Sequence, residues 1–83
     1  MNITLKLFAT LTDYLPADAK GNIAQLQLDD DTPLGTLLDD LKLPEKLVHL
    51  VLVNGADVAP DARARHPLVD GDTLAIWPPV AGG

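Results

Sequence analysis

The chain has 83 residues, with 12 acidic and 6 basic side chains and a net charge of −6. A chain this short forms one small domain and cannot enclose a deep catalytic cleft. The acidic balance argues against nucleic-acid binding, because such a partner requires a basic face that neutralises its phosphates. The lack of cysteine excludes a disulfide scaffold, a thiolate zinc site, an iron–sulfur cluster and a cysteine nucleophile. No apolar run approaches the roughly 20 residues that cross a bilayer, so we expect a cytoplasmic protein without a membrane partner.

The first third of the sequence predicts two strands with a helical turn between them. Residues 3–7 alternate apolar and polar side chains, which is typical of a half-buried strand and unlike the apolar block of a signal peptide. Residues 8–15 favour a short helical turn that stops at Pro16, and residues 24–28 alternate again as a second strand. An ordered loop between the two strands would allow them to pair antiparallel.

A single main helix is predicted between Thr32 and Pro44. Thr32 is a suitable N-cap residue, and Pro33 suits the first helical position, where its missing N–H is not needed. Gly35 weakens the helix by about 1 kcal/mol relative to alanine. Pro44 ends the helix, because the residue before a proline is pushed out of the helical region. One apolar stripe faces a sheet, formed by Leu34, Leu37, Leu38 and Leu41.

The next segment predicts an interior strand followed by a tight turn. Residues 48–53 form a near-continuous apolar run, so we expect a strand that is covered on both faces. Asn54-Gly55 is a strong tight-turn signal, because both residues tolerate positive φ. Val58 then begins a short returning strand.

The last strand is predicted over residues 73–77, after a polar, proline-broken stretch at residues 59–67. Pro78-Pro79 prevents this strand from continuing as a central member of a sheet. The order of elements indicates an α+β fold, a β-grasp (ubiquitin-like) roll with a mixed sheet of about five strands and one main crossing helix. We expect this domain to span residues 1–77 and an extended tail to span residues 78–83.

The body of the domain offers no catalytic constellation. Residues 29–31 are all aspartate, but a solvated turn that favours the following helix N-terminus explains them. Asp70 and Asp72 flank a turn glycine and have the same explanation. His49 is interpreted as a hydrogen-bonded structural histidine on a strand, and His66 lies in a loop. No local spacing makes a metal site, and the chain contains no serine for a nucleophilic triad.

The chemistry is instead predicted in the tail, Pro78-Pro79-Val80-Ala81-Gly82-Gly83. Proline fixes φ and a proline pair favours extended backbone, so the six residues can project and reach roughly 20 Å. Gly82 and Gly83 lack a Cβ, so a narrow channel in a partner can close around their backbone. The alternative is a frayed end that carries two glycines by chance. The proline pair directly after a strand favours the functional interpretation.

The sequence resembles the MoaD/ThiS sulfur-carrier family. The resemblance is carried by residues 66–83, which run through Trp77-Pro78-Pro79 to Gly82-Gly83, and by the segments Leu7-Phe8-Ala9 and Leu52-Val53-Asn54-Gly55. Length and element order agree over essentially the whole chain. An aromatic residue, two prolines, a short spacer and two glycines are most similar to the MoaD branch, the small subunits of molybdopterin synthase.

The resemblance implies that the Gly83 carboxylate is the working group. An α-carboxylate is ionised at pH 7 and is a poor electrophile, so it must be activated. In the family, an adenylating enzyme of the ubiquitin-activating type (ThiF-like or MoeB-type) uses ATP and magnesium to form an acyl-adenylate. Persulfide sulfur from a donor such as a cysteine desulfurase displaces AMP and leaves a thiocarboxylate. This group then donates sulfur to a pterin precursor in the MoaE-type large subunit of molybdopterin synthase.

The same resemblance implies roles for individual residues. Phe8 and Trp77 are expected to lie at the partner interface. We expect the chain itself to bind no cofactor or metal and not to catalyse a reaction without its partners. The residues expected to insert into the partner's tunnel are Pro78, Pro79, Val80, Ala81 and Gly82.

Three alternatives remain. The chain could deliver sulfur to another acceptor, such as thiazole or a tungsten-bound pterin, although Pro78-Pro79 favours the pterin pathway. It could be a ubiquitin-like modifier whose Gly83 carboxyl is joined to a lysine. It could also be a non-covalent binding module that adds a partner strand at an open sheet edge, and Gly83 would then be dispensable.

Overall fold

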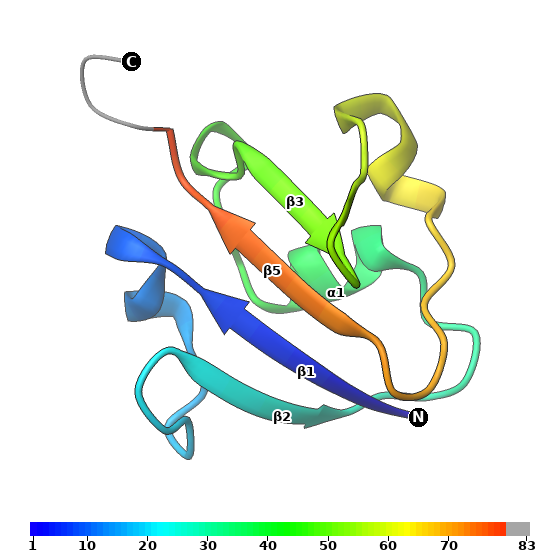
Figure 1. The fold of residues 1–83 in the computed structure, drawn as a ribbon, viewed down its shortest axis with the longest axis horizontal. Coiled ribbons are helices and arrows are strands. Elements are labelled where there is room, and N and C mark those ends of the chain that lie inside the picture. The colour runs from blue at the N-terminus through cyan, green and yellow to red at the C-terminus, as the bar shows by residue number, and fades with distance from the viewer. Residues whose placement is uncertain (80–83) are drawn as a thin grey trace.

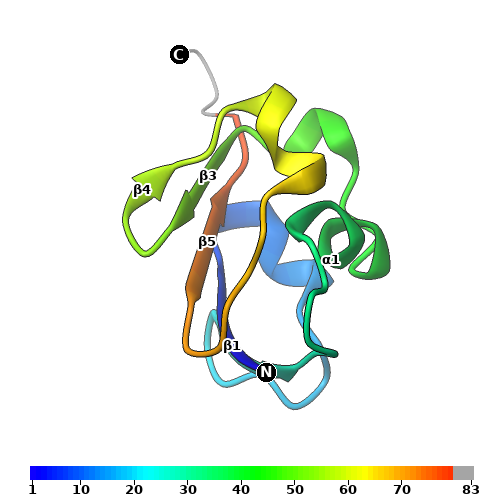
Figure 2. The same cartoon turned by 90° about the vertical axis from the view of Figure 1, so that its right-hand side faces the viewer.

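The computed structural model describes residues 1–79 of the chain. Five strands form one mixed sheet in the order β2-β1-β5-β3-β4, and all helices lie on one side of it (Figures 1 and 2). The predicted α+β roll with one main crossing helix is therefore confirmed. The elements are β1 (Asn2–Leu7), β2 (Ile23–Gln27), α1 (Leu34–Asp40), β3 (Leu50–Val53), β4 (Ala56–Asp57) and β5 (Thr73–Trp77).

The strand pairing brings three chain segments to one corner of the sheet. β1 runs parallel to β5 and antiparallel to β2, whereas β3 runs antiparallel to both β5 and β4. The ends of β1 and β5 therefore lie beside the beginning of β3, as Figure 1 shows. Because β5 leads directly to Pro78, this corner is where the chain leaves the sheet.

The core lies between the sheet and α1. Alternate residues of the three central strands are buried, and Leu34 and Leu37 of α1 pack against them. This arrangement follows from the period of two in strands and the i, i+3 spacing in the helix. The large buried residues of these three strands are Ile3, Leu5, Leu7, Val51, Val53, Leu74 and Ile76.

Three 3₁₀-helices complete the helical side: η1 (Ala9–Tyr14), η2 (Glu45–Leu47) and η3 (Pro60–Arg65). η1 confirms the predicted helical turn over residues 8–15. η3 lies within the stretch 59–67, for which the sequence predicted no element. No helix within residues 1–79 has the length and apolar character needed to span a bilayer.

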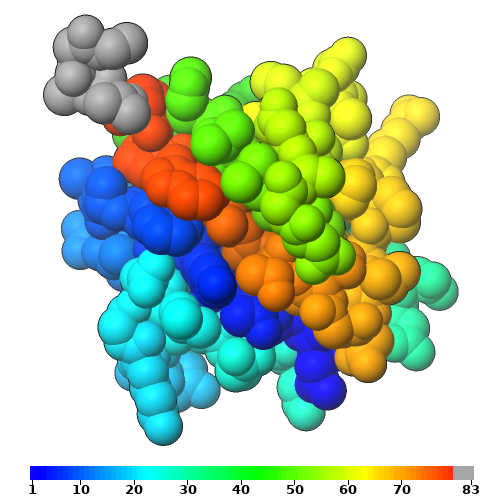
Figure 3. All heavy atoms as spheres, in the orientation of Figure 1, coloured from blue at the N-terminus to red at the C-terminus, as the bar shows by residue number. Residues whose placement is uncertain are grey.

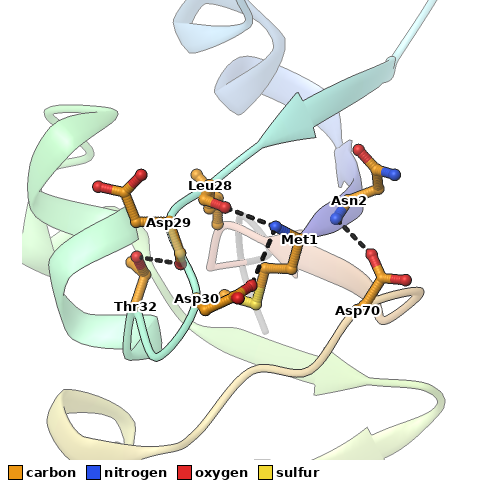
Figure 4. A network of polar contacts seen from close by, with 7 residues as sticks. All are labelled: Met1, Asn2, Leu28, Asp29, Asp30, Thr32 and Asp70. Atoms are coloured by element: carbon orange, nitrogen blue, oxygen red, sulfur yellow. Dashed lines mark hydrogen bonds and ion pairs between the residues drawn. The ribbon is translucent and has the colours of Figure 1, made fainter.

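The predicted N-cap of the main helix is wrong by one position. Pro33 occupies the N-cap with ψ 160°, and α1 begins at Leu34. The Thr32 hydroxyl turns back instead and donates a hydrogen bond of 2.7 Å to the Asp29 carbonyl (Figure 4). A threonine hydroxyl can donate to a nearby backbone carbonyl instead of accepting from a helical N–H. Here the Thr32 hydroxyl donates to a carbonyl in the turn of residues 29–31 and is not available as a helix cap.

The predicted end of the helix at Pro44 is also wrong. α1 ends at Asp40, and Lys42 has a φ of 59°. The Lys42 N–H donates to the Asp39 carbonyl and the Leu43 N–H to the Leu38 carbonyl, which together form a Schellman motif. A glycine is the usual residue at the left-handed position, so a lysine there gave no signal in the sequence.

Gly35 has a packing role that its helix propensity does not reveal. A Cβ built on Gly35 would lie 2.6 Å from the Ala64 carbonyl oxygen and 2.7 Å from the Ala64 Cα. α1 and η3 therefore pack backbone against backbone, and glycine is the residue that permits this approach.

The strand predicted over residues 48–53 is shorter and less covered than expected. β3 begins at Leu50, and Leu50 and Leu52 are half-buried while Val51 and Val53 are buried. The expectation of cover on both faces is wrong, because helices pack on only one face of the sheet. The Asn54-Gly55 turn is confirmed, with φ values of 53° and 84°. It leads into β4, which precedes Val58 rather than beginning there.

Candidate functional site

The end of β5 is held by its neighbours on both sides. The Phe8 N–H donates to the Ile76 carbonyl at 3.2 Å, and the His49 N–H donates to the Trp77 carbonyl at 3.0 Å. Beyond Trp77 the strand cannot continue pairing, because neither of the next two prolines has an N–H. Pro78 is buried and Pro79 is exposed. The chain thus leaves the sheet from a fixed position.

The two predicted interface residues contact each other. The rings of Phe8 and Trp77 stack with centroids 4.1 Å apart and planes 7° from parallel. The parallel register of Leu7 in β1 with Ile76 in β5 places the next residues, Phe8 and Trp77, side by side. Both side chains are half-buried, so the stack keeps an accessible surface. Sequence resemblance named these two residues separately, and the sheet topology explains why they form one feature.

Leucine side chains of β3 lie beside this stack on the sheet face turned away from α1, which also carries Thr4 and Lys6 of β1. Leu50 is the register partner of Trp77, and Leu52 is the partner of Ala75. Figure 3 shows this face, on which β1, β5 and β3 lie side by side without a covering element. We call Phe8, Leu50 and Trp77 the aromatic corner. Accessible apolar side chains that lie together are typical of a protein-binding surface.

Two polar features behind this face were missed by sequence reasoning. The Arg63 guanidinium donates to the carbonyls of Val58, Val48 and His49 at 3.0, 3.1 and 2.9 Å. Arg63 lies in η3, and the sequence alone identifies it only as a charged residue in a polar stretch. His49 itself is exposed and directly precedes β3, so its interpretation as a strand residue is wrong. The hydrogen bonds at His49 involve its backbone.

Asp72 is the second missed feature, because it is not a solvated turn residue. Its side chain is buried, with 5% relative exposure. One carboxylate oxygen accepts from the Val69 N–H at 2.9 Å and the other from the Asn54 amide at 2.8 Å. The Asn54 side-chain oxygen in turn accepts from the Thr73 N–H at 2.9 Å. This network fixes the beginning of β5.

The solvent exposure predicted for the other turn aspartates is confirmed. Residues 29–31 and Asp70 are exposed. Asp70 accepts a hydrogen bond from the Asn2 N–H, and Figure 4 shows this contact beside the 29–31 turn. Within residues 1–79, no three histidine or carboxylate side chains lie close enough together to hold a metal ion.

The other predicted site residues fall outside the part that can be described. Val80, Ala81, Gly82 and Gly83 lie outside the described residues. The described part of the site therefore consists of the aromatic corner, Pro78 and Pro79.

A five-stranded mixed sheet packed on one helix, with its last strand leading into a proline pair, defines a ubiquitin-like protein of the β-grasp fold. Residues 5–83 match the ThiS family. The chain belongs to this family of ubiquitin-like sulfur carriers, and the resemblance seen in the sequence is confirmed. No curated protein sequence matches the chain.

Solved structures support the same fold. The crystal structure of SAMP1 from Haloferax volcanii is 28% identical with a TM-score of 0.71, and the match covers 100% of both chains. The solution structure of the Haloferax volcanii HVO 2177 protein is 29% identical with a TM-score of 0.77, covering 100% of this chain and 87% of that one. A chain of the complex between subunits 1 and 2 of molybdopterin-converting factor from Helicobacter pylori 26695 is 24% identical, with a TM-score of 0.61 and 100% of both chains covered. This last likeness concerns the fold alone.

Proposed function

We propose that this protein carries sulfur as a thiocarboxylate on Gly83 for molybdopterin synthesis. The observation that carries the proposal is the aromatic corner, which lies where β5 gives way to Pro78 and Pro79 in a member of the ThiS family. A carrier needs a chain end that a partner can reach and a surface beside it that the partner can recognise. The corner is such a surface.

Partner docking would use the apolar face around the corner. Phe8, Leu50 and Trp77 are half-buried in the isolated chain, so a partner can remove further apolar area from water. Aromatic side chains at the centre of an interface carry much of the binding energy. The net charge of −6 favours partners with basic surfaces and faster encounter at low salt.

The chemistry would take place at the Gly83 carboxyl. Its oxygen attacks the α-phosphate of ATP in the adenylating enzyme and releases pyrophosphate, with magnesium supplied by that enzyme. A persulfide sulfur then attacks the acyl carbon, the bond to AMP breaks, and reductive cleavage of the sulfur–sulfur bond by a thiol leaves the thiocarboxylate. Gly82 and Gly83 allow close approach to this carbon, because they have no Cβ. The chain supplies the carboxylate and its docking surface, and the partners supply the catalysts.

The assignment to molybdopterin rests on two supports. The sequence ends in an aromatic residue, two prolines, a spacer and two glycines, as in the MoaD branch. The similar Helicobacter pylori chain belongs to a complex of subunits 1 and 2 of molybdopterin-converting factor. By analogy, we propose that a MoaE-type large subunit binds the aromatic corner and receives residues 78–83.

Protein modification is the second candidate, and one specific observation favours it. SAMP1 is similar over its full length, and another structure of the same organism describes it as small archaeal modifier protein 1. In this alternative, the Gly83 carboxyl forms an isopeptide bond with a lysine of a target protein. The two functions share the activation step and differ in the acceptor.

Reconstitution tests the proposal and separates the candidates. The chain is incubated with a MoeB-type enzyme, ATP, magnesium and a sulfur donor, and then with a MoaE-type subunit and the pterin precursor. We expect a thiocarboxylate and sulfur transfer to the pterin. A chain extended by one residue after Gly83 should fold normally and accept no sulfur. Normal sulfur loading of the extended chain would contradict the role of Gly83, and isopeptide adducts without pterin turnover would favour the modifier.

Gly82→Val provides a milder test of the same tail. Valine adds a branched side chain one residue from the reacting carbon, so we expect loss of adenylation or tunnel insertion. The melting temperature should change little. A large melting shift would assign Gly82 a structural role instead.

A further inference from the structure

Arg63 makes an unusual set of contacts for a residue of a surface 3₁₀-helix. All three of its guanidinium nitrogens donate to backbone carbonyls, those of Val58, Val48 and His49. These carbonyls come from two separate segments, one just before β3 and one just after β4. The planar guanidinium can satisfy several acceptors at fixed angles, whereas a lysine ammonium cannot reproduce that fork. Arg63 therefore joins η3 to both sides of the β3–β4 hairpin.

The contact with His49 leads directly to the aromatic corner. The His49 carbonyl accepts from Arg63 at 2.9 Å, and the His49 N–H donates to the Trp77 carbonyl at 3.0 Å. Leu50, the next residue, is the register partner of Trp77. Trp77 is the last residue of β5, and the proline that follows offers no N–H for a further bond. His49, which directly precedes β3, thus provides the last backbone N–H that bonds the end of β5 on this side, and its carbonyl is bound by Arg63.

A ligand-binding role would be the obvious alternative for a partly buried arginine. Arg63 does line a groove of about 590 Å³ between α1 and η3, together with Asp39 and Glu45. All three guanidinium nitrogens are engaged with carbonyls of the chain, however, and the two carboxylates would repel an anion. The geometry favours a role within the chain.

We infer that Arg63 is a positioning residue for Trp77, acting through His49, and thereby sets the docking geometry of the aromatic corner. This inference rests on the proposed function only in assuming that the activating enzyme binds the aromatic corner. On the other side of β5, the Phe8 N–H bond to Ile76 and the ring stack hold the corner independently. Loss of Arg63 should therefore loosen the β3 side and leave the β1 side in place.

Trp77 reports on its own position, because it is the only tryptophan in the chain. We compare Arg63→Lys and Arg63→Met with Arg65→Met, which removes the same charge from an exposed residue of the same 3₁₀-helix. Well below the melting temperature, both Arg63 variants should show Trp77 more accessible to acrylamide quenching. Amide exchange of His49 should accelerate by about tenfold or more. Arg65→Met should match the wild type in both measurements.

Activation kinetics form the second arm of the experiment. Adenylation of the chain by a MoeB-type enzyme should show KM raised by about fivefold or more and kcat within about twofold, because docking and not chemistry is altered. Asp72→Asn serves as a control that destabilises the opposite end of β5. If Asp72→Asn raises KM as much at equal distance from its melting temperature, general loosening explains the effect and the inference is overturned.

The outcomes separate this inference from the proposed function. Unchanged Trp77 quenching and unchanged His49 exchange in the Arg63 variants would overturn it, and so would altered quenching with an unaltered KM. If the wild-type chain is not adenylated at all, the proposed function fails. The fluorescence and exchange data would then still show whether Arg63 positions Trp77, while the docking consequence would be refuted.

Discussion

The two ends of β5 are built in contrasting ways. At Thr73, side chains satisfy backbone groups: Asp72 accepts from Val69 and Asn54, and Asn54 accepts from the Thr73 N–H while its own N–H donates to the Thr73 carbonyl at 2.8 Å. At Trp77, the strand ends in a half-exposed aromatic stack and two prolines. One end is closed within the chain, and the other presents apolar surface.

This contrast separates stability from recognition within one strand. The buried carboxylate of Asp72 is fully paired, and no buried side-chain polar atom lacks a partner among residues 1–79. Such a network fixes the register of β5 and leaves little for a partner to contact. The Trp77 end instead presents a half-buried aromatic stack, part of which stays accessible. Changes at the Thr73 end should therefore lower stability, and changes at the Trp77 end should mainly weaken docking.

The largest expected effect on stability is that of Asp72→Ala. It leaves two donors without their acceptor, the Val69 N–H and the Asn54 amide, and each such loss costs about 1–3 kcal/mol. We expect the free energy of unfolding in urea to fall by about 2–4 kcal/mol.

Asp70→Ala is the matched control for Asp72→Ala. It removes an exposed acceptor of the Asn2 N–H, which water can replace, so less than about 1 kcal/mol should be lost. Equal losses for the two variants would contradict the idea that burial of the Asp72 network fixes this end.

Gly35→Ala decides between two opposite expectations. Helix propensity alone predicts stabilisation by about 1 kcal/mol. The close contact with Ala64 predicts destabilisation by about 1–3 kcal/mol, because the added Cβ would meet backbone atoms. Thermal unfolding gives the sign, with Thr36→Ala as the control on the exposed side of the same turn. A more stable Gly35→Ala would show that η3 can move away from α1 without loss.

Phe8→Leu should have a small effect on stability and a clear effect on docking. The leucine keeps an apolar side chain but loses the stack on Trp77, which is worth about 0.5–1.5 kcal/mol. We expect unfolding to become easier by about 1 kcal/mol and the KM for adenylation to rise. A loss of stability as large as that of Asp72→Ala, with an unchanged KM, would reverse the comparison of the two ends.

Much of the fold was accessible from local sequence patterns. The alternation in residues 3–7 identified β1, the apolar run before Pro78-Pro79 identified β5, and Asn54-Gly55 identified the turn after β3. These signals are local, because strand periodicity and turn preferences depend on neighbouring residues. The tail motif and the resemblance it carries also named Phe8 and Trp77 before any contact between them was known.

The missed features depend on contacts between distant parts of the chain. Asp72 looks like a turn residue until Asn54 is placed beside it, and Arg63 looks like a surface charge until Val48 and His49 come within its reach. Gly35 looks like a defect in a helix until Ala64 is packed against it. Tertiary contacts override local propensity at each of these positions.

The central claim is that the Trp77 end of the molecule serves a sulfur-loaded chain terminus. Intact mass spectrometry of the protein purified from its native host tests it most directly. We expect a species heavier by the difference between one sulfur and one oxygen, localised to Gly83 by fragmentation and lost on hydrolysis. Only unmodified protein, both from the host and after incubation with the activating enzyme, ATP and a sulfur donor, would contradict the account.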